Sequence, residues 1–238
     1  MNTTMGILGG MGPLATVDFV RKIINQTAAT RDQEHLPLLI HSVPQIPDRT
    51  ACLLGNRESP LAALEKGLRT LVDAGVGCIA IPCNTAHYWH GDLARVSPVP
   101  ILHIARACAE PLAAQGIGSV GLMATDGTLK AGFYAGELAR YGIRLIEHPA
   151  ALQQRIMQGI YRVKSGALTE GALMLESCLR TLLDTGVERI ILGCTEIPLA
   201  LDSLDACPGN AGIDATSALA RACIDWYRAQ PNARVEAA

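Results

Sequence analysis

The 238-residue sequence lacks the marks of several protein classes. No apolar run is long enough to span a membrane, because glycine, proline or charge interrupts each one at strand length. Lysine and arginine form no basic stripe and the net charge is only -2, so neither a membrane nor a nucleic acid is an expected partner. With 49% hydrophobic and 18% charged residues, the chain is expected to fold as a globular protein with sizeable cores.

The amino-terminal segment also lacks the basic region of a secretion signal. Residues 1–17 are apolar but contain five glycines or prolines, so a first strand and turn are expected there, in a cytoplasmic protein. The eight cysteines include no CxxC pair. Free thiols, most of them buried as small apolar side chains, are therefore expected instead of a disulfide framework.

The most informative feature is an internal repeat. Residues 64–83 (LEKGLRTLVDAGVGCIAIPC) and 175–194 (LESCLRTLLDTGVERIILGC) are identical at 11 of 20 positions, at a constant offset of 111. Each copy has the pattern of an amphipathic helix, a glycine stop, an apolar strand and a final cysteine, Cys83 or Cys194. A repeat of this length predicts two similar, domain-sized lobes, each placing a thiol just after a strand.

Short apolar segments alternate with helical patterns along the whole chain. Strands are expected over residues 4–9, 38–42, 76–82, 100–104, 119–124, 144–147, 187–193 and 211–213. This alternation predicts an α/β fold with two pseudo-symmetric lobes, each a parallel sheet flanked by helices. The first lobe is expected to contain residues 1–103 plus 211–238, and the second residues 104–210. Ligands of such sheets bind at the carboxyl ends of strands, so the active site is expected in the cleft between the lobes.

The matched cysteines indicate chemistry, although a lone cysteine in such a turn is more typical of a packed core. Backbone N–H groups at a helix start favour nearby anions, so each cysteine is expected to be held near its thiolate form. A planar carbanion must be reprotonated on the face opposite to deprotonation. An acid and a base on opposite sides of a carbon therefore racemise it, and two cysteines meet this need.

Six segments spread in order along the chain resemble the aspartate/glutamate racemase family, and its aspartate racemases most closely. They are GILGGMGPLAT (6–16), RDQEH (31–35), PQIPDRT (44–50), PCNTAH (82–87), GIYRVKSG (159–166) and GCTEI (193–197). The resemblance implies two pseudo-symmetric lobes with the site between them, and one catalytic cysteine from each. It implies racemisation of an acidic amino acid without pyridoxal phosphate or any other cofactor, by a homodimer. Some family members have threonine at the first cysteine, and this chain keeps both.

The resemblance also implies roles for the residues around the cysteines. It makes Arg49 the partner of the substrate's distal carboxylate, which a planar guanidinium suits, and Lys164 a second cation over the site. By resemblance to glutamate racemases, Cys83 serves the D-enantiomer and Cys194 the L-enantiomer. The other residues expected to bind substrate are Met11, Gln45, Asn84, Thr85, Thr125, Thr128, Thr195 and Glu196.

Several other interpretations stay open from the residues alone. Residues 10–15 fit a loose GxGxxA dinucleotide fingerprint, although Pro13 removes an N–H that a pyrophosphate would use. Cys83, His87 and His90 suggest a metal site, but no fourth ligand is evident and no metal is expected. His87, one helical turn after Cys83, either tunes that thiol or simply caps and packs.

A carboxylate can also act on one of the thiols. If Glu196 lies beside Cys194, its charge would raise the pKa of that thiol, which suits a protonated partner at rest. The predicted function is cofactor-independent racemisation of an acidic amino acid, most of all aspartate. The alternatives are a glutamate or broad-specificity racemase, an isomerase or decarboxylase of small dicarboxylates, and a two-lobe binding protein, which would not need paired thiols.

Overall fold

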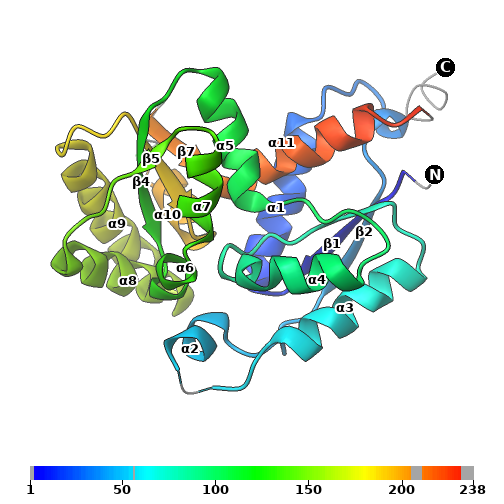
Figure 1. The fold of residues 1–238 in the computed structure, drawn as a ribbon, viewed down its shortest axis with the longest axis horizontal. Coiled ribbons are helices and arrows are strands. Elements are labelled where there is room, and N and C mark those ends of the chain that lie inside the picture. Colours follow the sequence, from blue (N-terminus) through cyan, green and yellow to red (C-terminus); the bar gives the residue numbers. More distant parts are fainter. Residues whose placement is uncertain (1–2, 56, 205–210, 232–238) are drawn as a thin grey trace.

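The computed structural model describes residues 3–55, 57–204 and 211–231, and its strands form two separate parallel sheets (Figure 1). The first sheet has the order β2-β1-β3, with β1 at Met5–Gly9, β2 at Leu38–Ser42 and β3 at Cys78–Ala80. The second has the order β5-β4-β6-β7, with strands at Ser119–Ala124 (β4), Arg144–Leu145 (β5), Arg189–Gly193 (β6) and Gly212–Asp214 (β7). The predicted α/β fold with parallel sheets is confirmed.

Helices connect the strands and cover the sheets. In the first half of the chain they are α1 (Pro13–Gln26), α2 (Arg49–Leu54), α3 (Leu61–Asp73), α4 (His90–Val96) and α5 (Ile104–Ala114), with 3-10 turns η1 (Asp32–Glu34) and η2 (Thr85–Trp89). In the second half they are α6 (Asp126–Ala131), α7 (Phe133–Arg140), α8 (Ala150–Lys164), α9 (Leu168–Leu183), α10 (Glu196–Asp202) and α11 (Ala215–Arg228). Within the described residues, no helix is long and apolar enough to cross a membrane.

The sequence repeat corresponds to one helix–strand unit in each sheet, α3–β3 and α9–β6. Three identical leucines of each copy, spaced by four and three residues, form the buried stripe of its helix: Leu64, Leu68 and Leu71 in α3, and Leu175, Leu179 and Leu182 in α9. Burying each such side chain stabilises the fold by about 1.5–3 kcal/mol relative to exposure. The repeated letters therefore encode the packing that fixes each strand, and its cysteine, against a helix.

The two sheets have the same strand order, except at one edge. β3 pairs with β1 as β6 pairs with β4. Beyond β6 the second sheet continues with β7, whereas the strand expected at 100–104 is only a single bridge between Ile79 and Ile101. Both cysteines thus follow equivalent strands of equivalent sheets.

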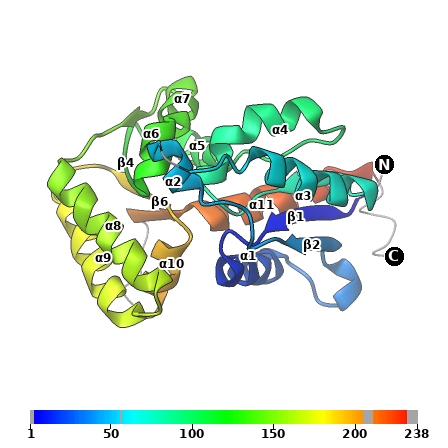
Figure 2. The same ribbon diagram turned by 90° about the horizontal axis from the view of Figure 1, so that it is seen from below.

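The last described segment joins the two lobes. We predicted that residues 211–238 return to the first lobe, but β7 pairs with β6 and so belongs to the second sheet, where it covers the edge of β6. Only α11 reaches the first lobe, where it packs on α1, and it also packs on α5 (Figures 1 and 2). The boundary expected at residue 210, and residues 232–238, lie outside the described residues.

One central core belongs to both lobes. It contains Met5 and Ile7 of β1, Val120 and Leu122 of β4, and buried side chains of α5 and α11. Separate clusters fill the outer side of each sheet, one under α3 and one under α8 and α9. The shared core places the carboxyl ends of the two sheets at a fixed distance, and the pocket described next lies there.

Candidate active site

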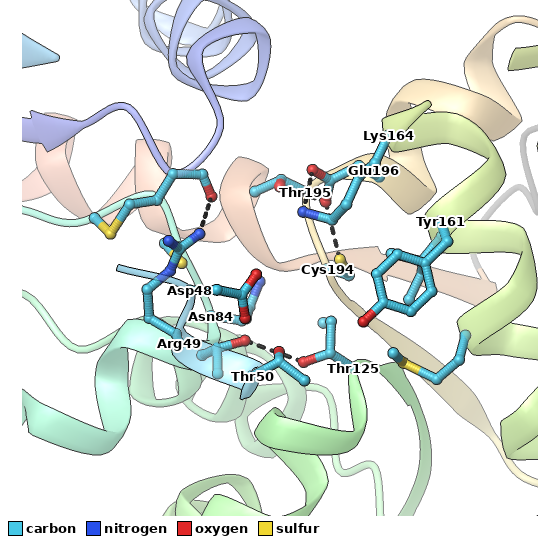
Figure 3. Close-up of a pocket in the computed structure, with 16 residues that line it drawn as sticks. Asp48, Arg49, Thr50, Asn84, Thr125, Tyr161, Lys164, Cys194, Thr195 and Glu196 are labelled. Carbon is cyan, nitrogen blue, oxygen red and sulfur yellow. Dashed lines mark hydrogen bonds and ion pairs between the residues drawn. The ribbon is translucent and has the colours of Figure 1, made fainter. Parts of the chain in front are cut away.

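A pocket lies between the lobes, at the carboxyl ends of the strands (Figure 3). Side chains from both lobes line it. Ten of the twelve residues expected at the site do so: Met11, Arg49, Cys83, Asn84, Thr85, Thr125, Lys164, Cys194, Thr195 and Glu196. The two cysteines of the repeat therefore face one cavity, as the sequence repeat predicted.

The other two expected residues do not line the pocket. Gln45 is exposed, because its loop instead turns the neighbouring Ile46 into the core, where Ile46 is only 3% exposed. Thr128 is fully buried behind the pocket wall, and its hydroxyl lies 2.9 Å from that of Thr85 and 3.0 Å from that of Thr125. The prediction that Gln45 lies at the site is therefore wrong. Thr128 contacts the lining residues without reaching the pocket.

Three threonine hydroxyls connect the two lobes below the pocket. Thr85 comes from the first lobe, and Thr125 and Thr128 from the first turn of α6 in the second, where Thr125 caps the helix. The approach is close because position 127 is glycine. A Cβ there would lie 2.9 Å from the Cα of Thr50. This contact brings α6 against α2, as Figure 2 shows, and fixes both walls of the pocket relative to each other.

Cys194 directly follows β6 and is 6% exposed. Its thiol donates a hydrogen bond to Oε2 of Glu196 at 3.0 Å (Figure 3). Burial raises the pKa of Cys194 well above its ordinary value, and the charge of Glu196 raises it further, although Lys164 acts in the opposite direction. The expectation that helix geometry holds Cys194 as a thiolate is therefore wrong. The raised pKa favours a protonated Cys194 thiol at rest.

Glu196 and Lys164 form an ion pair at 2.9 Å across the same side of the pocket. Burial is the largest single influence and disfavours the charged form of each, but the partner's charge and the hydrogen bonds around the pair together outweigh it. The pKa of Lys164 is raised, and the pKa of Glu196 is lowered, with the Cys194 thiol and the Thr195 hydroxyl contributing hydrogen bonds to the carboxylate. Lys164 is consequently a cation at the pocket that is already paired with a carboxylate of the protein, Glu196.

Cys83 lies in the short segment between β3 and η2 and is 6% exposed. Its carbonyl oxygen lies 3.0 Å from Nδ1 of His87, so that nitrogen carries the proton. Burial, together with His103, lowers the pKa of His87 to about 3, which keeps the ring neutral. His87 does not line the pocket and packs against other aromatic rings. Its role is therefore to hydrogen-bond the Cys83 backbone and to pack against the neighbouring rings. Within the described chain, no group of His, Cys, Asp and Glu is arranged to hold a metal.

Arg49, the first residue of α2, has a guanidinium held by main-chain oxygens. It donates to the carbonyls of Ile46 and Pro47 at 3.1 Å each and to that of Met11 at 3.4 Å. Nε is buried without a hydrogen-bond partner. A guanidinium has five N–H donors, so two remain for an anion, the number that a two-pronged carboxylate contact needs.

Asn84 is held by a tyrosine of the second lobe. The hydroxyl of Tyr134, on α7, donates to Oδ1 of Asn84 at 2.5 Å, and both residues are almost fully buried. Because the amide oxygen is taken, the amide Nδ2 of Asn84 is the group left over, and it is buried without a partner. The amide of Asn84, the residue after Cys83, thus has N–H donors without a protein acceptor.

In the first glycine-rich turn, one N–H that a dinucleotide site would use is already paired within the protein. The N–H of Gly10 donates to the hydroxyl of Thr16 at 2.8 Å. Gly10 has φ +93°, and a Cβ there would lie 2.4 Å from the backbone of Val43, so glycine is required for the turn itself. The turn brings Met11 into the pocket wall.

The pocket also contains residues that the sequence did not single out. They are Asp48, Thr50, Met157, Ile160, Tyr161 and Gly193. Three of them, Met157, Ile160 and Tyr161, share a helix face with Lys164, at positions i-7, i-4 and i-3. The helical spacing that runs from Met157 into the GIYRVK segment could have identified them. Asp48 and Thr50 flank Arg49 in the PQIPDRT segment, but their direction depends on how α2 begins, which the sequence pattern did not define.

Known proteins with similar sequence and structure include amino-acid racemases. The broad-specificity amino-acid racemase of Bacillus subtilis is 27% identical over 231 residues, covering 94% of this chain and 98% of that protein. The aspartate racemase of Picrophilus torridus has a TM-score of 0.80 at 30% identity, covering 99% of each chain. An aspartate racemase homologue from Pyrococcus horikoshii has a TM-score of 0.75 at 25% identity, covering 95% of this chain and 99% of that one.

The sequence model of one family extends over nearly the whole described chain. This family, Asp/Glu/hydantoin racemase, matches residues 8–223, which include the glycine-rich turn, both cysteines and most of α11. The match confirms the resemblance inferred from the motifs. The chain belongs to the Asp/Glu/hydantoin racemase family.

Proposed function

We propose that the protein is a cofactor-independent racemase of an acidic amino acid, with aspartate the preferred substrate. The observation that carries this proposal is the pair of thiols. Cys83 and Cys194 follow equivalent strands in two lobes and line one pocket from both sides. Such a pair gives one proton-transfer group for each face of a substrate carbon.

In the proposed reaction the two cysteines exchange a proton through the substrate. Cys83 as thiolate removes the Cα proton of the D-enantiomer, and the Cys194 thiol delivers its proton to the opposite face to give the L-enantiomer. Cys83 is then a thiol and Cys194 a thiolate, which is the arrangement that the reverse reaction needs. The protonated state of Cys194 at rest supports its role as the first donor.

The polar groups of the pocket support a substrate with two carboxylates. Arg49 has two N–H groups to spare and binds the distal carboxylate in this proposal. The unpartnered amide of Asn84 and the adjacent hydroxyl of Thr85 bind the α-carboxylate, next to Cys83. The neutralised pair of Lys164 and Glu196 closes the opposite wall.

One second candidate has its own support. The Bacillus subtilis relative is a broad-specificity amino-acid racemase that covers 94% of this chain. A broad-specificity racemase is therefore the alternative substrate assignment, with the same two cysteines.

The experiment is racemisation by the purified protein without added cofactor. L- and D-forms of aspartate, glutamate and alanine are incubated separately, and the enantiomers are resolved by chiral chromatography. We expect aspartate to be racemised fastest, from both directions, and the Cys83→Ala variant to be inactive. Equal rates on all three amino acids would favour the broad-specificity alternative. No racemisation of any of them by the wild-type protein would refute the proposal.

A further inference from the structure

Two cations and two carboxylates line the pocket, and only one cation and one carboxylate form an ion pair with each other. Lys164 and Glu196 neutralise each other at 2.9 Å. Within the described residues, the Arg49 guanidinium donates only to main-chain oxygens. Asp48, which also lines the pocket, has no ion-pair partner among those residues. One positive and one negative group therefore face the cavity without a counter-charge.

Asp48 is held in position by the start of α2. Its Oδ1 accepts a hydrogen bond from the N–H of Ala51 at 2.7 Å, which makes Asp48 the N-cap of that helix. Pro47 before it limits the backbone further. Figure 3 shows the carboxylate beside Asn84 and directed into the pocket, facing the wall that carries Cys194. The cap fixes one oxygen of the carboxylate and leaves the other for a ligand.

We infer that Asp48 binds the α-ammonium group of the substrate and thereby selects amino acids over simple dicarboxylates. The inference rests on the proposed function and extends it. Arg49 binds a carboxylate of the substrate. The α-ammonium group is the substrate's only cation, and Asp48 is the carboxylate of the pocket left to pair with it, since Glu196 is already paired with Lys164. A charge-assisted contact of this kind fixes both position and orientation.

This contact would also serve the chemistry at Cα. A protonated amino group withdraws electrons from Cα and makes its C–H bond more acidic. In this inference Asp48 stabilises the protonated form of the α-amino group and so maintains that effect on Cα. A dicarboxylate without an amino group would instead place its anions near the unpaired Asp48, and such repulsion is a common source of specificity.

The test uses Asp48→Asn, which keeps the helix cap, since asparagine and aspartate are about equally good N-cap residues. Binding of L-aspartate and of succinate is measured by titration calorimetry, and racemisation of aspartate in parallel. We expect aspartate affinity and kcat/KM to fall about 10- to 100-fold, as for loss of a hydrogen bond between charged groups. Succinate affinity should stay unchanged or improve. The matched control is Asp92→Asn, an exposed change on α4 that should alter neither ligand.

The outcomes separate the two proposals. Equal losses for aspartate and succinate, or a fall in melting temperature with no change in ligand preference, would reduce Asp48 to a helix cap and overturn the inference. Unchanged aspartate binding by Asp48→Asn would also overturn it. If the wild-type protein racemises no acidic amino acid but Asp48→Asn still loses aspartate and keeps succinate, the inference about the ammonium group stands and the proposed reaction fails.

Discussion

Replacing Arg49 by alanine tests the anion site most sharply. The guanidinium donates three hydrogen bonds to carbonyls of Met11, Ile46 and Pro47 and keeps two N–H groups for a ligand. Without it the distal carboxylate of aspartate would enter the pocket with no cation free to receive it. Breaking a buried charge pair in this way costs about 2–5 kcal/mol, which is a loss of roughly 30- to 5,000-fold in kcat/KM.

The loss of stability should be much smaller. Arg49 itself lines the pocket, so water can fill the space it leaves and replace the missing donors, and a loss of about 1 kcal/mol is expected. For a chain of this size that corresponds to a fall in melting temperature of about 2–4 °C. Arg49→Lys should recover only part of the activity, because an ammonium cannot hold the carbonyls and grip a carboxylate with two prongs.

The assay is steady-state racemisation of aspartate by chiral chromatography, with thermal unfolding of each variant. Arg95→Ala is the matched control, since Arg95 pairs with Asp92 on the surface of α4 and should be dispensable. If Arg49→Ala keeps kcat/KM within about threefold of wild type, a change under 1 kcal/mol, the reasoning fails. Lys164 would then be the next candidate for the distal carboxylate.

Three further predictions follow from the same contacts. Glu196→Gln removes a carboxylate that raises the pKa of Cys194, so alkylation of that thiol by iodoacetamide should reach half its maximal rate at a lower pH; an unchanged or higher midpoint would contradict this. Tyr134→Phe leaves the amide of Asn84 free to rotate, and kcat/KM should fall about tenfold, as for a lost hydrogen bond between buried groups. If only the melting temperature falls, Tyr134 merely packs. Exhaustive chelation should leave activity unchanged, because the described residues contain no group of side chains arranged to hold a metal. The purified protein should have no pyridoxal phosphate absorption band, because Lys164, the lysine of the pocket, is already paired with Glu196.

The sequence predicted the architecture well because the repeat encodes packing. The leucines at 64, 68 and 71 and their counterparts at 175, 179 and 182 are the buried stripes of α3 and α9. Periodicity of this kind defines a helix face, the strand after it and the cysteine at the strand's end. The residues that later line the pocket from α8 follow the same rule, since they share a face with Lys164.

Other features depended on contacts between distant segments. β7 adds to the second sheet because the edge of β6 is open there, and no local pattern states which sheet a three-residue strand will join. The raised pKa of Cys194 depends first on burial and then on Glu196, against the opposing charge of Lys164, which lies 30 positions earlier in the chain than the cysteine. Burial and that carboxylate outweigh the helix terminus, so the expectation of a thiolate failed. The direction of the Asp48 side chain depends on its capping of α2, a helix only six residues long.

The most direct test of the two-cysteine account is isotope exchange at Cα in deuterium oxide. Wild-type protein should convert L-aspartate to D-aspartate that carries deuterium at Cα, while recovered L-aspartate keeps its proton at early times. This is expected because the removed proton stays on one thiol and the opposite thiol supplies a solvent deuteron. Cys194→Ala should abolish racemisation and leave exchange of D-aspartate alone, through Cys83. Racemisation by Cys194→Ala at the wild-type rate, or early product that retains the original proton, would contradict a mechanism with one thiol on each face of the substrate.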